Sequence, residues 1–156
     1  MSKWNDAPMW KGLCDGTLCP ICTRGHPLDL IDTLPSSWLT IPEKAPMPGY
    51  ACLVSRIHAV ELHDLDETQA IGFILDARRV ARAVTAATRA VKLNYEIHGN
   101  TLPHLHMHIF PRHRGDRFEG RPIDPRDIRE PAYGPGELNA YRAAIRTHLQ
   151  NPNALD

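Results

Sequence analysis

The chain has 156 residues, of which 42% are hydrophobic, and this is the size of one domain with a single core. Eighteen Lys and Arg residues balance eighteen Asp and Glu residues, so no global field would attract nucleic acid or anionic lipid. We therefore expect one domain over residues 1–156, no nucleic-acid partner, and anion binding only at a local site.

The N-terminal stretch MSKWNDAPMWKG carries charge and proline where a signal peptide has an apolar region. No run approaches the roughly 20 apolar residues of a membrane span. The four cysteines, Cys14, Cys19, Cys22 and Cys52, are not spaced like a secreted disulfide framework. These features predict a cytoplasmic protein with no membrane partner.

The first half of the chain is expected to be irregular and then extended. Residues 1–27 are expected to be irregular structure around the cysteines. Short extended runs follow at 28–33 and 37–41, and a β-rich run extends from Tyr50 to Ile57. Two or three antiparallel strands are predicted here.

From Asp66 onward apolar residues recur at alternating steps of three and four, which predicts one long amphipathic helix. The stripe consists of Ala70, Phe73, Ala77, Val80, Val84, Ala87 and Val91. Asp64 or Asp66 could cap its start. The arginines at 78, 79, 82 and 89 lie off the stripe and are expected to face solvent. The stripe itself could serve the monomer core or a dimer interface.

After the helix, residues 92–99 and the segment HLHMHIFPR at 104–112 are predicted to pair as a hairpin around the turn NTLP. A loop rich in proline and glycine follows, and a last helix is predicted from about Glu137. The fold class is therefore α+β, an antiparallel sheet with one long helix and a C-terminal helix.

Three of the nine histidines alternate with large apolar residues in the predicted strand. Side chains alternate faces along a strand, so His104, His106 and His108 should share one face while the intervening residues enter the core. Their spacing of about 6.5 Å suits contact with successive atoms of one ligand. The row could hold a metal ion or bind a phosphate, because neutral imidazole can serve as ligand, nucleophile or hydrogen donor.

The pair CPIC at 19–22 has a spacing that suits two corners of a tetrahedral zinc site. A thioredoxin-like role is disfavoured, because the pair lies in a leader containing glycine and proline. Composition alone leaves the other ligands open among His26, His58, His63 and Cys14. Cys52 lies in an apolar run and is expected to be a small core residue.

The segment HLHMHIF resembles the His-φ-His-φ-His-φφ signature of the histidine triad (HIT) superfamily of nucleotide hydrolases and transferases. PGYACLVSRIH at 48–58 resembles the family's upstream element, a strand followed by a histidine, with Tyr50 where a histidine is common. GNT before the triad and PRHRGDRF after it resemble the branches nearer the dinucleoside polyphosphate hydrolases. The resemblance covers about residues 19–118 and implies a HIT-like fold, with a C-terminal loop and helix over 119–156.

The resemblance implies roles for individual residues. His106 would attack the α-phosphorus of a nucleotide and form a nucleotidyl-imidazole intermediate. His108 would contact a phosphate oxygen or protonate the leaving group, and Asn100 and Thr101 would contact phosphate or the leaving group. The implied activity is hydrolysis of dinucleoside polyphosphates or nucleoside phosphoramidates. A nucleotidyltransferase or phosphorylase, or a non-catalytic nucleotide-binding module, is the alternative.

The same resemblance implies a Cys2His2 zinc site made of Cys19, Cys22, His58 and His104. Four protein ligands leave no open position, so the zinc would be structural. Family members are commonly homodimers, and a homodimer is expected here. A zinc-based nucleic-acid binder is disfavoured, because the chain has one CxxC and no basic stripe with interleaved aromatic residues.

Overall fold

The computed structural model of the chain describes residues 3–124, 126–128 and 131–151. The ends of the expected domain, residues 1–2 and 152–156, lie outside the described residues. The helical elements are η1 (Lys3–Asn5), α1 (Ala7–Cys14), α2 (Pro20–Arg24), η2 (Leu62–Asp64), α3 (Glu67–Thr88) and α4 (Glu137–Gln150). The strands are β1 (Leu30–Thr33), β2 (Ser37–Thr40), β3 (Ala51–Ser55), β4 (Lys92–Glu96) and β5 (His106–Arg112).

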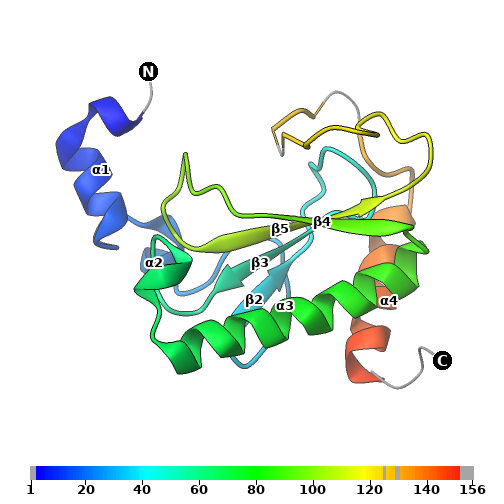
Figure 1. Cartoon of the computed structure of the whole chain (residues 1–156), viewed down its shortest axis with the longest axis horizontal. Coiled ribbons are helices and arrows are strands. Elements are labelled where there is room, and N and C mark those ends of the chain that lie inside the picture. The colour runs from blue at the N-terminus through cyan, green and yellow to red at the C-terminus, as the bar shows by residue number, and fades with distance from the viewer. Residues whose placement is uncertain (1–2, 125, 129–130, 152–156) are drawn as a thin grey trace.

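The five strands form one antiparallel sheet in the order β1-β2-β3-β5-β4 (Figure 1). The predicted hairpin is confirmed as β4 and β5. Strands β3 and β5 lie next to each other within the sheet, with Cys52 opposite His108 and Val54 opposite His106. The segments PGYACLVSRIH (48–58) and HLHMHIF (104–110) are far apart in the sequence. This register places them side by side.

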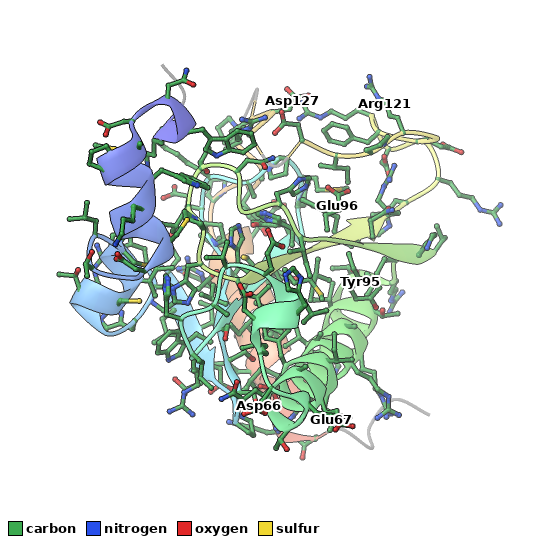
Figure 2. All side chains as sticks on the ribbon, turned by 60° about the vertical axis from the view of Figure 1, so that its left-hand side comes forward. Asp66, Glu67, Tyr95, Glu96, Arg121 and Asp127 are labelled. Carbon is green, nitrogen blue, oxygen red and sulfur yellow. The ribbon has the colours of Figure 1, made fainter. Side chains whose placement is uncertain are left out.

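Helices α3 and α4 cover one face of the sheet, and together with it they enclose the larger core cluster. Asp66 caps α3 through the backbone N–H of Gln69, and Asp66 and Glu67 stand at the start of this helix in Figure 2. The carboxylate of Asp76 accepts hydrogen bonds from Ser36 N at 2.8 Å and Ser37 Oγ at 2.7 Å. This buried carboxylate therefore fastens α3 to the β1–β2 turn.

The long helix is confirmed, and its three arginines and Arg89, which follows it, are exposed as expected. Its predicted stripe was wrong at Val91, which lies beyond the helix and is 65% exposed. The helix ends at Thr88 because Arg89 adopts a left-handed conformation with φ 53°. The turn this produces directs the chain into β4.

The expectation of irregular structure over residues 1–27 was wrong, because α1 and α2 form there. Asp6 caps α1 by accepting from Met9 N, and a proline stands in the first turn of each helix, where its missing N–H costs nothing. Figure 1 shows α1 at one end of the molecule, outside the sheet and its helices.

The opposite face of the sheet carries a second, smaller buried cluster that includes Tyr50, Cys52, Phe110, Phe118 and Ile123. The last two belong to the segment that follows β5, which crosses this face in Figure 1. Gly49, just before β3, has φ +79° and lies against Thr88 and Pro111, so an added Cβ would lie 2.7 Å from Thr88 Cγ2. Among the described residues no helix is long and apolar enough to cross a membrane.

Candidate functional site

Cys19, Cys22, His58 and His104 form a cluster whose four ligand atoms all lie within 4.8 Å of one another. The Nδ1 atoms of the two histidines are 3.2 Å apart. Sulfur-to-nitrogen distances are 3.4 Å from Cys19 to His104, 3.7 Å from Cys22 to His104 and 3.3 Å from Cys22 to His58. A zinc tetrahedron has edges of about 3.3–3.8 Å, given its bond lengths. The cluster could therefore hold a metal ion.

Backbone carbonyls set the orientation of both histidine rings in this cluster. Nε2 of His104 donates to Ser55 O at 2.8 Å, and Nε2 of His58 donates to Cys14 O at 2.9 Å. Each ring therefore keeps its proton on Nε2 and turns the Nδ1 lone pair toward the cysteines. Gly16 has φ +85° and allows the loop to pass against His58, where an added Cβ would lie 3.3 Å from the ring.

The other residues that composition left open do not enter the cluster. The Cys14 carbonyl orients His58, but its thiol is not part of the group, and His26 and His63 also lie outside it. Cys52 is buried in β3, as expected of a core residue. Burial, together with the neighbouring Cys19, raises the pKa of the Cys22 thiol to about 11.

His104 precedes β5, which begins at His106, so the strict strand alternation across all three histidines was wrong. The backbone of Leu105 instead bonds to two other parts of the chain. Ser55 N donates to Leu105 O at 2.9 Å, and Leu105 N donates to Ala59 O at 2.7 Å. The intervening residues Leu105, Met107 and Ile109 still enter the larger core cluster, between the sheet and helices α3 and α4, as expected. The three histidines also lie together, although His104 reaches the metal-binding cluster and the other two face a cavity.

The ring of His106 is fixed by the residue two positions before it. Its Nδ1 donates to the carbonyl of His104 at 2.7 Å, which leaves the lone pair on Nε2. Burial lowers the pKa of His106, so the ring is neutral at pH 7. A neutral imidazole with a free lone pair is the form required of a nucleophile.

His108 is only 7% exposed and is surrounded by aromatic rings. Its ring centroid lies 4.8 Å from that of His106, 5.5 Å from His98 and 5.8 Å from both Tyr50 and Phe110. Burial, and then the neighbouring histidines 106 and 98, lower its pKa to about 3. His108 is therefore neutral at pH 7 and a poor source of a transferable proton.

A cavity of about 550 Å³ opens over His106 and His108. Asn100 and Thr101 line it and are exposed, so they are available to a ligand. The structure brings these four predicted residues together at one cavity. Sequence reasoning missed other lining residues: Pro42, Lys44, Tyr50, Glu96, His98, Pro122, Ile123, Asp124 and Arg126. Of these, Tyr50 was noticed only as a departure from the family pattern.

The far wall of the cavity comes from the segment after β5. Ile123 is 1% exposed, and its N–H donates to Glu96 Oε1 at 3.4 Å. Figure 2 shows Glu96 on the side of β4 that faces this segment, which also carries Arg121 and Asp127. Arg112 anchors its start by a bidentate pair with Asp116, with both N–O distances 2.9 Å. No periodic pattern marks this segment, so the sequence offered no signal for it.

The chain belongs to the HIT domain family, whose model matches residues 27–115. The structure is similar to a histidine triad protein from Bradyrhizobium japonicum at 34% identity, with a TM-score of 0.69 over 77% of this chain and 89% of that one. It also has the fold of a Zn-bound histidine triad family protein from Mycobacterium smegmatis, at 21% identity and a TM-score of 0.64 over 88% and 99% of the two chains.

A third similar structure is the Plasmodium falciparum diadenosine triphosphate hydrolase in complex with Cyclomarin A. Identity is 18%, and the TM-score is 0.55 over 82% of this chain and 79% of that one. No curated protein matches the chain. The comparisons confirm the α+β HIT fold expected from the sequence.

Proposed function

We propose that the protein is a nucleotide hydrolase that cleaves dinucleoside polyphosphates or nucleoside phosphoramidates at the α-phosphorus. The observation that carries this proposal is the pair of neutral imidazoles at the cavity, one of which, His106, has its Nδ1 hydrogen bound to the His104 carbonyl. Family membership and the similarity to a diadenosine triphosphate hydrolase support the substrate class.

In the proposed reaction Nε2 of His106 attacks the α-phosphorus and forms a P–N bond. The bond from phosphorus to the leaving atom breaks, and its electron pair leaves with that atom. The leaving atom is oxygen in a dinucleoside polyphosphate and nitrogen in a phosphoramidate, and the nitrogen takes a proton from solvent as it leaves. The positive charge that develops on the ring is stabilised by the His104 carbonyl, which accepts the hydrogen bond from Nδ1–H of His106. Water then attacks phosphorus, loses a proton to solvent, and breaks the P–N bond. His108 donates a hydrogen bond to a phosphate oxygen, and Asn100 and Thr101 bind the phosphate or the leaving group.

The test is release of nucleoside monophosphate from a dinucleoside tetraphosphate and from an adenylyl phosphoramidate. We expect His106→Ala to reduce turnover at least about 10³-fold, because it removes the nucleophile. His63→Ala, a change at an exposed histidine outside the cavity, is the matched control and should keep wild-type turnover. Turnover that survives His106→Ala would refute the nucleophile assignment.

The covalent step is shared with transferases, and the acceptor separates the two activities. With a dinucleoside tetraphosphate and inorganic phosphate, a phosphorylase converts the attacked half to nucleoside diphosphate, whereas a hydrolase converts it to nucleoside monophosphate. The other half leaves as nucleoside triphosphate in both cases. Tight nucleotide binding by an inactive wild-type protein would instead indicate a binding module. The triad is complete in the sequence, and two of its histidines line the cavity, which favours an enzyme over that module.

We also propose that the metal ion of the Cys19, Cys22, His58 and His104 cluster is a structural zinc. Two thiolates and two neutral imidazoles are a donor set that zinc prefers, and they complete four-coordination. The Zn-bound family member from Mycobacterium smegmatis supports this choice of metal. When bound, zinc would join Cys19 and Cys22, at α2, to His104, which lies two residues before β5 begins.

We also propose that residues 1–156 form one domain and that this domain is the subunit of a homodimer. One exposed apolar face supports the homodimer. Ile71, Ile74 and Leu75 of α3 are exposed, as is Tyr95 on the edge strand β4. A cavity of about 870 Å³ runs between this helix and this strand. Light scattering after size-exclusion chromatography should give twice the mass of one chain. Ile74→Arg should produce monomers, whereas Leu28→Arg, a change at another exposed apolar residue, should not.

A further inference from the structure

The hydroxyl of Tyr50 lies 2.7 Å from Nδ1 of His108, within the buried cluster on the cavity face of the sheet. Two arrangements satisfy this distance. The phenol can donate to a bare Nδ1, which places the ring proton on Nε2. Alternatively, Nδ1–H can donate to the phenol oxygen, which leaves Nε2 as an acceptor. Only the first arrangement gives His108 a hydrogen to offer to a phosphate.

The surroundings of the hydroxyl decide between the two arrangements. The thiol of Cys52, which shares the buried cluster with Tyr50 and lies opposite His108 in the β3–β5 register, is the other polar group that interacts with this hydroxyl. If Nδ1 of His108 donated, the phenol hydrogen would have to go to sulfur, which is a weak acceptor. If the phenol donates to Nδ1, the strong acceptor receives the strong donor, and the phenol oxygen can still accept from the thiol. The first arrangement, in which the phenol donates to Nδ1 of His108, therefore uses each group better.

The phenol retains its hydrogen at pH 7, because burial raises the pKa of Tyr50 far above its ordinary value. Its place is also fixed, since the ring stacks against His108 at 5.8 Å and against Phe110 at 5.1 Å. The side chain is 6% exposed, so water does not compete freely for the contact.

We propose that Tyr50 is a positioning residue that donates to Nδ1 of His108 and holds that ring as its Nε2–H tautomer. The neighbouring His106 is held as the opposite tautomer, because a carbonyl accepts from its Nδ1. One ring thus offers a lone pair and the next offers a hydrogen to the same cavity. The catalytic value of this arrangement rests on the proposed function, whereas the tautomers themselves do not.

The tautomers can be read directly by two-bond ¹H–¹⁵N spectra of the ¹⁵N-histidine-labelled protein at pH 7. His108→Asn identifies the signals of His108. We expect wild-type His108 to carry its proton on Nε2 and His106 to carry its proton on Nδ1. A wild-type His108 protonated on Nδ1 would overturn the proposal without the need for any variant.

Variants at position 50 test the cause. In Tyr50→Phe the His108 signals should move toward the average of the two tautomers, and kcat for a dinucleoside tetraphosphate should fall about tenfold, the effect of one lost hydrogen bond, at little changed KM. Tyr50→His restores a donor and should restore both readouts in part. Tyr141→Phe, which removes another buried phenol whose hydrogen goes to Gly49 O at 2.6 Å, should leave the His108 tautomer unchanged.

A Tyr50→Phe protein whose His108 signals match the wild type would overturn the positioning role. If wild-type protein hydrolyses no nucleotide but shows the expected tautomers, the proposed function fails and the tautomer assignment stands supported. The two failures are therefore distinguishable.

Discussion

Acidification from pH 7 to pH 5 should destabilise the protein, and His108 should account for a measurable part of the loss. The folded state holds the pKa of this histidine at about 3, against an ordinary value of 6.5. At pH 5 the unfolded chain therefore binds a proton at this residue that the folded chain does not bind. Stability rises with pH wherever the unfolded state binds more protons, so it must fall as the pH is lowered through this window.

The magnitude follows from these two pKa values. Between pH 7 and pH 5 the linkage relation gives a loss of about 2 kcal/mol from His108 alone. Carboxylates whose pKa is held low in the fold, such as Asp116 beside Arg112, contribute little here, because they stay ionised in both states at pH 5. Burial also lowers the pKa of His104 and of His106, so these residues add to the loss, and the His108 contribution is isolated by comparison with a variant that lacks this ring.

The assay is urea unfolding of wild type and His108→Asn at both pH values, with zinc held at the same concentration. Asn does not titrate, so the variant should lose about 2 kcal/mol less than wild type between pH 7 and pH 5. His63→Asn, at an exposed residue, should follow the wild type. Equal losses in wild type and His108→Asn would refute the reasoning, because they would show that His108 titrates alike in both states.

Three further changes test other parts of the structure. Removal of metal by a chelator at pH 7 should lower the melting temperature, and Cys22→Ser should lower zinc content, measured by mass spectrometry, from one ion per chain to well below one. Asp76→Ala should cost about 2 kcal/mol in urea unfolding, because it leaves Ser36 N and its neighbouring hydroxyl without their acceptor. Gly49→Ala should cost about 2 kcal/mol in the same assay, since it combines a left-handed φ with a Cβ 2.7 Å from Thr88 Cγ2.

Each of these changes has a matched control. Cys14→Ser, outside the metal-binding cluster, should keep wild-type zinc content, and equal zinc in Cys22→Ser would contradict the ligand set. Asp76→Asn keeps one acceptor oxygen and should cost less than the alanine variant; the reverse order would argue against the role of these hydrogen bonds. Gly25 has φ +85° and open space around it, so Gly25→Ala measures backbone strain alone. A cost at Gly49 no larger than at Gly25 would exclude the steric contribution.

The elements that the sequence predicted well are those with a clear period. The hairpin of β4 and β5 and the helix α3 follow from repeats of two and of three to four residues. Helices α1 and α2 were missed because they are too short to show a period, although Asp6 with a proline two residues later was an available N-terminal signal. Similarly, Val91 continues the repeat but lies beyond the left-handed turn that ends α3.

At the site, sequence spacing and the resemblance predicted the residues that the structure brings together. The partners that orient these residues could be identified only from the three-dimensional structure. Tyr50 meets His108 only because the β3–β5 register places Cys52 opposite that histidine. Ile123 reaches the cavity from a segment without repeats, fixed by its hydrogen bond to Glu96. Such contacts depend on which strands pair and in which register. A local sequence pattern predicts neither the pairing nor the register.

His104 belongs to two centres at once, since its ring faces the cysteines while its own carbonyl accepts a hydrogen bond from Nδ1–H of His106. A protein designer who transplants HLHMH into another scaffold would therefore import the row of imidazoles without the groups that orient them. The scaffold would also have to supply a carbonyl behind His104, where Ser55 O now stands, and a phenol behind His108. The smallest segment that could be transplanted with its function is a pair of adjacent strands together with the backbone groups between them.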